Sequence, residues 1–322
     1  MTIPVAVHPL VSPWGRFGLY SFFIDAPEPA IVDTGIASSP ADGMAPALEA
    51  IGRRIEDVRW ILLTHGHIDH IGGAYALWEL TGRRAKVVIH EADAPMLRSR
   101  RAHVDEYLAG RGQYLQDPEG ESKQVAVTNA VISGEMEPSM LVRGGEAISL
   151  GGDVTVSVHS IPGHTPGSVA YVIDGQNDVF VGDAVQVHGA ANGFPGYVDP
   201  EGYRFSLEYL RDKVRPRHLY LGHPYRRANG TPYGVELDES QAREALRESL
   251  AIEAQVSEAT CGCLTAGLED TESPYSPFAP VAKELKYDGN PTLEPSPFFT
   301  TMNGYRTQST TMPFQRSIHN HG

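Results

Sequence analysis

The stretch Thr64-His65-Gly66-His67-Ile68-Asp69-His70 holds three imidazoles and a carboxylate within its last six residues. An apolar run at 60–63 precedes it and a helical pattern at 74–80 follows, so we expect the order strand, loop, helix. Open α/β sheets place their ligands at the carboxyl ends of strands. Because His and Asp are ligands of Zn, Fe and Mn, the stretch predicts a metal site. A purely hydrogen-bonded turn is the alternative, and this density of ligand-type side chains argues against it.

Three later turns repeat the pattern of strand, glycine and ligand-type side chain. They place His164, Asp183 and His223 after predicted strands at 154–160, 178–181 and 217–221. An earlier turn, Asp33-Thr34-Gly35, offers a carboxylate with two possible roles. It either caps its own turn or accepts a hydrogen bond from a histidine ligand and thereby selects the tautomer of that ring. We expect a structural or rim role for His188, which lies five residues after Asp183, and structural or surface roles for His90 and His103.

Strand-like and helix-like segments alternate along most of the chain, which predicts a layered α/β architecture. The region at about 103–142 interrupts this alternation as a long connection. Connections of this kind are often functional, so we expect either a substrate lid or a docking insertion for a partner. Its candidates to cover a pocket are Tyr107, Tyr114, Leu115 and Met140.

The C-terminal part changes character after about residue 258. A helix from Asp238 to about Glu258 is expected to begin with a capping box, with Gln241 as the reciprocal partner of Asp238. Beyond Thr260 the chain is rich in Pro and aromatic residues and has little periodicity. We predict a catalytic domain at 1–235 and, at 236–322, a helix followed by an extended arm. The arm would pack on its own domain or on a neighbouring subunit of a homo-oligomer.

Composition and charge restrict the partners. The 322 residues include 26 Lys and Arg against 40 Asp and Glu, a formal net charge of −14, which argues against nucleic acid as a ligand. No signal peptide or membrane-spanning run is evident, so a soluble cytoplasmic protein is expected. Cys261 and Cys263 are too close to form a disulfide with each other. We expect two reduced thiols, with a second metal or redox site as the alternative.

The ligand-type residues together resemble the signature of the metallo-β-lactamase superfamily. That signature is a His-x-His-x-Asp-His loop followed by a distant His, an Asp and a final His. The matching residues are His65, His67, Asp69, His70, His164, Asp183 and His223. The turn at Asp33 also matches, and the resemblance covers roughly residues 5–225. It implies an αββα sandwich, in which two β-sheets pack face to face with helices on their outer faces.

The resemblance also implies two divalent metal ions. One would be held by His65, His67 and His164, the other by Asp69, His70 and His223, with Asp183 bridging them. Zn²⁺ is the expected ion, and Fe or Mn would suit the same ligands. Two bridged ions lower the pKa of a shared water enough to supply hydroxide near neutral pH, and Asp69 is expected to orient it. Tyr225, two residues after His223, either serves the leaving group or only packs.

The ligand pattern is most similar to glyoxalase II-like thioesterases and lactonases. No Cys lies near a ligand, unlike in the commonest zinc β-lactamases. We therefore predict a metal-dependent hydrolase that cleaves an ester, lactone, thioester or activated aryl ether in a small, weakly charged or aromatic molecule. The alternatives are an oxidoreductase similar to the mononuclear iron persulfide dioxygenases and a non-catalytic partner subunit with the same fold.

Overall fold

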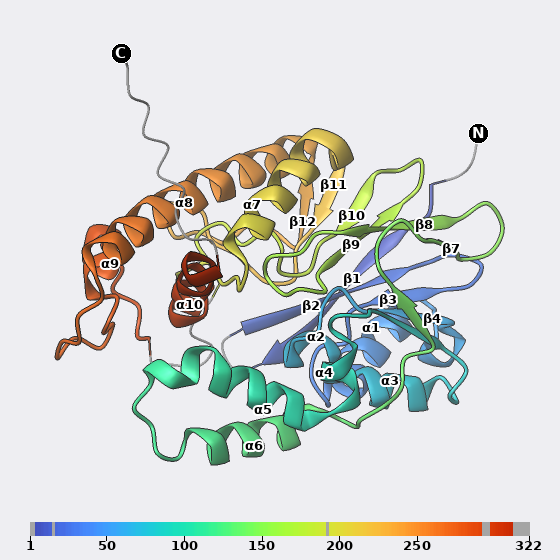
Figure 1. Cartoon of the computed structure of the whole chain (residues 1–322). Coiled ribbons are helices and arrows are strands. Elements are labelled where there is room, and N and C mark those ends of the chain that lie inside the picture. The colour runs from blue at the N-terminus through green and yellow to red at the C-terminus, as the bar shows by residue number, and fades with distance from the viewer. Residues whose placement is uncertain (1–3, 15–16, 191–192, 292–296, 312–322) are drawn as a thin grey trace.

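Two six-stranded β-sheets form the centre of the computed structural model, which describes residues 4–14, 17–190, 193–291 and 297–311 (Figure 1). The first sheet consists, in spatial order, of β1 (Val7–Trp14), β2 (Phe17–Ile24), β3 (Ala30–Val32), β4 (Trp60–Leu62), β5 (Lys86–His90) and β6 (Met140–Val142). The second consists of β12 (Glu236–Asp238), β11 (His218–Tyr220), β10 (Asp178–Phe180), β9 (Val169–Ile173), β8 (Thr155–Ser160) and β7 (Ala147–Ser149).

Parallel pairing brings the functional loops to one edge of each sheet. Strands β3, β4, β5 and β6 are mutually parallel, with Val32 opposite Leu62 and Leu62 opposite Val88. Strands β10 and β11 are also parallel, with Phe180 opposite Tyr220. The remaining pairs are antiparallel. Because parallel strands end at the same edge, the loops that follow β3, β4 and β5 lie side by side, as do those that follow β10 and β11.

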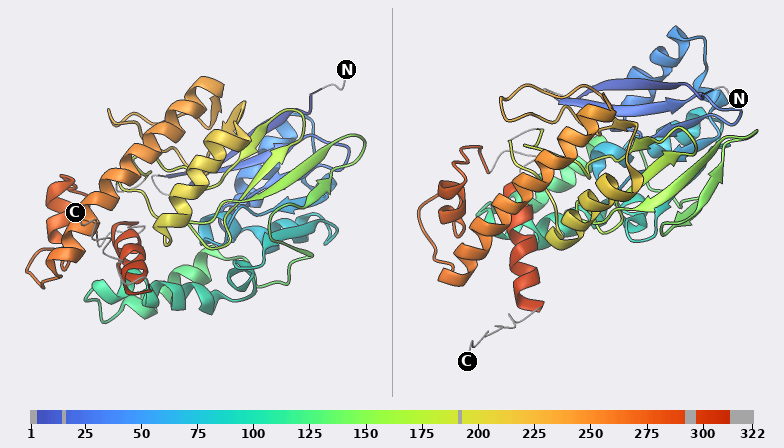
Figure 2. Two further views of the ribbon diagram at one scale, coloured as in Figure 1. Left: turned by 45° about the horizontal axis from the view of Figure 1, so that its top comes forward. Right: turned by 90° about the horizontal axis from the view of Figure 1, so that it is seen from above.

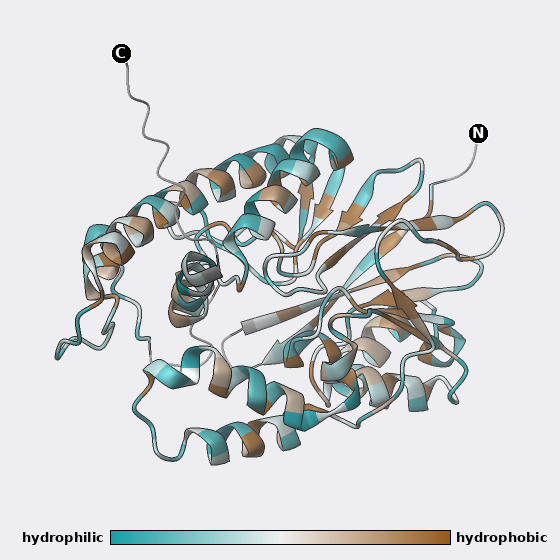
Figure 3. Cartoon of the chain, in the orientation of Figure 1, coloured by the Kyte–Doolittle hydropathy of each residue, from teal (hydrophilic) through white to brown (hydrophobic). Residues whose placement is uncertain are grey.

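Alternate residues of each strand face opposite layers. Val32, Leu62 and Val88 belong to the apolar core between the sheets, where the Phe22 ring lies 5.4 Å from Phe180, centroid to centroid. Their neighbours in the strands instead contact the outer helices, because side chains alternate along a strand. Helices cover both outer faces of the sheet pair (Figures 1 and 2), and apolar residues concentrate on the strands (Figure 3). The predicted αββα sandwich is confirmed.

The helices on the first sheet come from the N-terminal half of the chain. They are η1 (Pro40–Met44), α1 (Ala45–Ala50), η2 (Ile55–Asp57), α2 (Ile68–Ile71), α3 (Ala74–Leu80) and α4 (Ala94–Arg98). The second sheet is covered by α7 (Pro200–Tyr209), η4 (Leu210–Val214) and α8 (Glu239–Ala266). The predicted capping box of α8 is confirmed, since Asp238 and Gln241 exchange both hydrogen bonds.

The region at 103–142 is a helical hairpin rather than an irregular connection. It contains most of α5 (Arg100–Ala109), then η3 (Arg111–Tyr114) and α6 (Gly120–Val131). The Gly-rich and Pro-containing turns that interrupted the sequence pattern lie between and beside these helices. Met140 lies in β6 and packs against the core between the sheets, so the expectation that it covers a pocket was wrong.

The Pro- and aromatic-rich segment forms two helices with non-helical stretches around them, so it is not the extended arm that was expected. It forms α9 (Ala279–Glu284) and α10 (Pro297–Thr311). Phe278, Phe298 and Phe299 are fully buried in the same core as α8 and the second sheet, so the segment packs on its own chain. The polar and β-branched composition of α10 gives weak helix propensity, and packing supplies the missing stability. The boundary at 235/236 and the homo-oligomer stay predictions.

Two smaller expectations concern the cysteines and the membrane. Cys261 and Cys263 are both free thiols in the structure, and Cys263 is buried against the α8 core. None of the helices within the described ranges combines the length and the apolar character that crossing a bilayer requires.

Candidate metal centre

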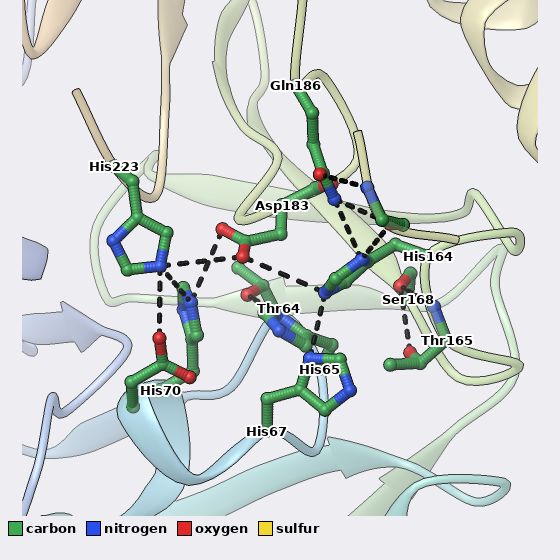
Figure 4. Close-up of polar contacts among 12 residues, drawn as sticks. Thr64, His65, His67, His70, His164, Thr165, Ser168, Asp183, Gln186 and His223 are labelled. Carbon is green, nitrogen blue, oxygen red and sulfur yellow. Dashed lines mark hydrogen bonds and ion pairs between the residues drawn. The ribbon is translucent and has the colours of Figure 1, made fainter. Parts of the chain in front are cut away.

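All seven predicted ligand residues converge in one place. Five lie in loops that follow strands, whereas Asp69 and His70 lie in α2, directly after the loop that follows β4. Figure 4 labels His65, His67, His70, His164, Asp183 and His223. The ligand-type atoms of the seven form three overlapping groups, in each of which the atoms lie within 4.8 Å of one another. The groups are His65 with His67 and His164, His65 with His70 and Asp183, and Asp69 with His70 and His223. The first and third groups are the two sets that the resemblance implied, and the second places Asp183 between them.

Two glycines allow these loops to approach so closely. A Cβ at Gly182 would lie 2.2 Å from Thr64 Oγ1, and the residue has a positive φ of 50°. A Cβ at Gly222 would lie 2.3 Å from Asp183 Oδ1. Neither distance is possible for a larger residue without movement of the neighbouring loop. The repeated glycine before each ligand is therefore a requirement of loop packing at the centre.

Asp33 selects the tautomer of His70, as one of its two predicted roles required. His70 Nδ1 donates to Asp33 Oδ2 at 2.8 Å, while the same carboxylate accepts from the backbone N–H of Thr64 at 2.8 Å and from its hydroxyl at 2.7 Å. With the proton on Nδ1, the His70 Nε2 lone pair points into the centre. There it lies 3.2 Å from His223 Nε2 and 3.3 Å from Asp183 Oδ1.

Gln186 positions His164 and was not identified from the sequence. His164 Nδ1 donates to the carbonyl oxygen of Gly196 at 2.6 Å, so its Nε2 faces His67 Nδ1 at 2.8 Å. The Gln186 amide donates to that carbonyl and to the carbonyl of Asp183, both at 2.8 Å, and accepts from the Gly196 N–H at 2.6 Å. One buried side chain thus connects the His164 and Asp183 loops. The feature of the sequence that could have identified Gln186 is its position three residues after Asp183.

Asp93 is a second positioning residue that the sequence interpretation missed. Its Oδ2 accepts from the Gly66 N–H at 2.8 Å and from the Thr165 hydroxyl at 2.7 Å, and its Oδ1 accepts from the Gly167 N–H at 2.9 Å. The buried carboxylate therefore joins the loop that carries His65 and His67 to the loop that carries His164. It follows β5 much as Asp33 follows β3, which is the pattern that could have identified it.

Two buried atoms at the centre have no hydrogen-bond partner among the described residues. They are His65 Nε2 and Asp183 Oδ1. Buried polar atoms are rarely left unsatisfied, and here Asp183 Oδ1 makes only a long contact of 3.3 Å with His70 Nε2 among the described residues, outside hydrogen-bond geometry. A divalent cation would satisfy both atoms, and imidazole with carboxylate is a donor set that Zn, Fe and Mn accept. The residues therefore fit a metal centre.

The electrostatics of the centre also favour added positive charge. Burial lowers the pKa of His70, but Asp183, Asp33 and Asp69 outweigh it and raise that pKa to about 10. The pKa of His65 lies well below its usual range, because burial and the neighbouring imidazoles of His70 and His164 disfavour a proton there. The carboxylates around His70 thus favour a cation at the centre. The unprotonated His65 ring keeps a nitrogen lone pair that can bind a metal ion.

Glu106 of α5 faces the outer side of a ligand. Its Oε1 lies 3.8 Å from His67 Nε2, the nitrogen that points away from His164. Burial raises the pKa of Glu106, but His67, His103 and Arg111 outweigh it and lower that pKa to about 2. The carboxylate is therefore ionised beside His67. It was missed because the hairpin brings it to the centre from 39 positions along the chain.

Tyr225 is buried beside the centre. Its ring lies edge-on to His223 at 5.9 Å between centroids. Burial and the carboxylates of Asp183 and Asp69 raise the pKa of Tyr225 well above its usual value, so the phenol stays protonated. It can therefore donate a hydrogen bond.

The remaining histidines lie outside the ligand set. His188 pairs with Glu248 at 3.0 Å, and His90 Nδ1 accepts from the Ala92 N–H at 3.1 Å. His103 is buried and its Nε2 lies 3.0 Å from the Met96 carbonyl, yet it also lines the cavity described next. His103 therefore has the predicted structural role and also forms part of the cavity wall.

A cavity of about 480 Å³ opens directly onto the centre. Its floor includes His67, Asp69, His164, Asp183 and His223. One wall comes from the hairpin of α5, η3 and α6, and another from α10. Most of the remaining lining is apolar, with Trp14, Ile68, Tyr107, Val127, Phe194 and Val198. The hairpin and the C-terminal segment, which have no recognisable motif, thus enclose the space above the ligands.

Comparison with known families and structures agrees with this arrangement. Residues 15–223 match the family model described as metallo-beta-lactamase superfamily. The chain belongs to this superfamily, as the resemblance indicated. The metallo-beta-lactamase family protein TTHA1429 from Thermus thermophilus has the same fold, with a TM-score of 0.65 and 21% identity over 95% of this chain and 94% of that one.

Two relatives in sequence are somewhat more similar to the chain than this structure is. The chain is 28% identical over 265 residues to a hydroxyacylglutathione hydrolase of Anaeromyxobacter dehalogenans (strain 2CP-C), covering 81% of this chain and 76% of that protein. It is also 28% identical over 207 residues to the uncharacterized protein YobT of Bacillus subtilis (strain 168), covering 61% and 78%. The chain is a hydrolase of the metallo-β-lactamase superfamily.

Proposed function

We propose that the protein is a dinuclear metal-dependent hydrolase of a small, weakly charged molecule with an ester, lactone, thioester or activated aryl ether bond. The observation that carries the proposal is the convergence of seven ligand residues around two unsatisfied buried atoms, His65 Nε2 and Asp183 Oδ1, at the floor of a mainly apolar cavity. A hydrogen-bonded structural cluster would not leave these atoms without partners.

The ligand residues divide between the two ions as their groups do. His65, His67 and His164 would hold one ion, Asp69, His70 and His223 the other, and Asp183 both. Ions bound there supply Lewis acidity, which lowers the pKa of a water and polarises the scissile bond. Asp33, Asp93 and Gln186 hold the ligand loops in place before any ion arrives, so little reorganisation is required on binding.

Asp69 and Tyr225 are the proposed catalytic side chains. Asp69 Oδ2 lies 3.1 Å from His223 Nε2, and the residue also lines the cavity, so it can orient a water molecule toward the substrate. Tyr225 also lines the cavity, and its protonated hydroxyl can donate to the leaving group. The apolar wall excludes bulk water from the reacting atoms.

The charges of the cavity support a weakly charged substrate. Among its described lining residues, Arg111 is the one Lys or Arg, and it lies near Glu106, whose pKa it helps to lower. Asp69 and Asp183 add negative charge to the floor. Two bound divalent ions would offset Asp69 and Asp183 at the floor, so the preference rests on the described wall, which offers an anionic group such as a glutathione carboxylate no Lys or Arg besides Arg111. The relatives nevertheless include hydroxyacylglutathione hydrolases. We therefore favour a neutral substrate over a glutathione thioester.

Metal analysis combined with a substrate panel tests the proposal. Protein purified without chelator should contain close to two transition-metal ions per chain and should cleave members of a lactone, thioester and aryl ester panel. Removal of metal should abolish the activity, and re-addition should restore it. Full activity of metal-free protein would refute the proposal. One iron per chain with oxygen consumption in the presence of a persulfide would instead identify an oxidative enzyme.

A further inference from the structure

The hairpin and the C-terminal helix meet at one side chain of the cavity wall. Asn303 of α10 lines the cavity, and its Oδ1 accepts hydrogen bonds from Tyr114 Oη at 2.9 Å and from Gln113 Nε2 at 3.1 Å. Both donors belong to η3 and its turn, about 190 positions earlier in the chain. The contact joins α10 to η3, two segments that the sequence pattern left unrelated.

Tyr114 is itself held firmly. Its ring stacks on Phe299 with centroids 5.2 Å apart and meets the edge of Phe278 at 5.4 Å. Its hydroxyl also accepts from Arg306 Nη1 at 3.1 Å. Because Phe278 and Phe299 are fully buried, the Tyr114 hydroxyl has little freedom to turn away from Asn303.

Helix α10 is fixed to the body of the protein at the other side. Tyr305 donates to Glu253 Oε1 at 3.0 Å, and Arg204 binds both oxygens of that carboxylate, at 2.6 and 3.0 Å. Glu253 is only 2% exposed, and a buried carboxylate with this many donors is strongly held. Thr301 also donates to the Pro195 carbonyl at 2.8 Å. Asn303 therefore stands on a rigid support.

The bonds to Asn303 determine which end of its amide is available. Gln113 and Tyr114 of η3 both donate to Asn303 Oδ1, so this oxygen is already used in hydrogen bonds within the wall. The Nδ2 group carries two N–H donors and is the part of the amide left to serve a ligand in the cavity. A neutral oxygen acceptor suits an uncharged donor in an apolar wall, whereas a carboxylate would meet the negative charge of Glu106 in the wall of the same cavity.

We propose that Asn303 is a specificity-determining residue that donates to a neutral oxygen acceptor on the non-reacting part of the substrate. Tyr114 and Gln113 are its positioning residues, since they hold the amide with Nδ2 toward the cavity. This inference rests on the proposed hydrolase function. It adds the requirement that the preferred substrate carries a carbonyl or ether oxygen away from the scissile bond.

A pair of ester series tests the proposal. The metal-loaded protein is assayed with 4-nitrophenyl esters of straight-chain acids and of ω-methoxy acids of equal length. The expected result is a preference of about fivefold in kcat/KM for the methoxy ester at the length that reaches Asn303, because one neutral hydrogen bond is made. Asn303→Leu should abolish this preference. Asn303→Asp, which keeps acceptors for Tyr114 and Gln113 but lacks the N–H donors, should abolish it too.

Two further variants separate recognition from general loosening of α10. Tyr114→Phe removes one donor to Oδ1 and should weaken the preference for the methoxy esters. Gln308→Leu is the matched control, because Gln308 tethers the same helix to Asp199 Oδ1 at 2.6 Å and does not line the cavity. It should leave the preference intact. A preference that survives Asn303→Leu, or its absence at every length in the wild type, would overturn the proposal.

Binding of inhibitors keeps this test independent of turnover. Straight-chain and ω-methoxy hydroxamates with the same acyl groups chelate a metal and can be measured by calorimetry on metal-loaded protein. If two ions are bound and no ester is cleaved, the proposed function fails. The Asn303 proposal still stands or falls on whether methoxy hydroxamates bind better than alkyl ones and lose that advantage in Asn303→Leu. Equal affinities throughout would refute it.

Discussion

The floor and the wall of the cavity are built in different ways. The floor consists of ligand residues that follow β4, β8, β10 and β11. The last three of these strands end at the same edge of the second sheet, because β10 is parallel to β11 and both β8 and β10 are antiparallel to β9. The wall consists of helices from the hairpin and the C-terminal segment, which meet through Asn303. Because the floor is tied to the sheets and the wall is not, the chemistry and the substrate preference can be altered separately.

The largest effect is expected from removing Asp183, the side chain that we propose both ions share. Asp183→Ala should lower turnover by about 1000-fold or more, since metal-ion stabilisation of the transition state is worth several kcal/mol. Metal content should fall with it. Asp174→Ala, an exposed carboxylate that bonds to Ser157, is the control and should leave both unchanged. If Asp183→Ala kept two ions and full activity, the ligand residues of the floor would not be what determines the chemistry.

Tyr225 tests whether the floor acts beyond holding metal. Tyr225→Phe should lower kcat by about 100-fold for esters of poor leaving groups and much less for a nitrophenyl ester, because only a poor leaving group needs a proton donor. Tyr233→Phe removes a phenol hydroxyl that bonds to Glu248 instead, and should not change the leaving-group dependence. An equal loss for all leaving groups in Tyr225→Phe would show that the residue only packs.

Glu106 belongs to the wall of the cavity and contacts His67, a candidate ligand in the floor. Glu106→Ala should weaken metal binding by about 10- to 100-fold, because carboxylates behind a histidine ligand orient the ring and raise its basicity. Glu106→Gln keeps an acceptor for His67 Nε2 and should recover part of the affinity. Asp105→Ala, one position earlier and paired with Arg101 at the surface, serves as the control. Metal titration measures all three, and unchanged affinity in Glu106→Ala would show that the wall does not support the metal centre.

The smallest effect concerns the stability of the metal-free protein. The folded pKa of His70 is raised to about 10, so its protonated form stabilises the fold below the unfolded pKa of about 6.5. That contribution is lost as pH rises through about 10. Metal-free protein should therefore melt at progressively lower temperature between about pH 6.5 and 10. Thermal scans with and without metal measure this, and a melting temperature that rises over this range would contradict it. Asp33→Asn should reduce the slope.

The sequence by itself determined the layered α/β architecture and the seven candidate ligands, and through the family resemblance the sandwich, but it left two roles open for Asp33. Ligand spacing is local and strand ends are recognisable from apolar runs, so the convergence of these residues follows from sheet geometry. Asp93 and Gln186 carry a similar local signal. Tertiary structure alone decided the wall. Glu106 reaches His67, and Asn303 meets Tyr114, because helices with weak intrinsic propensity are held by packing, and no spacing in the chain encodes which helix faces will meet.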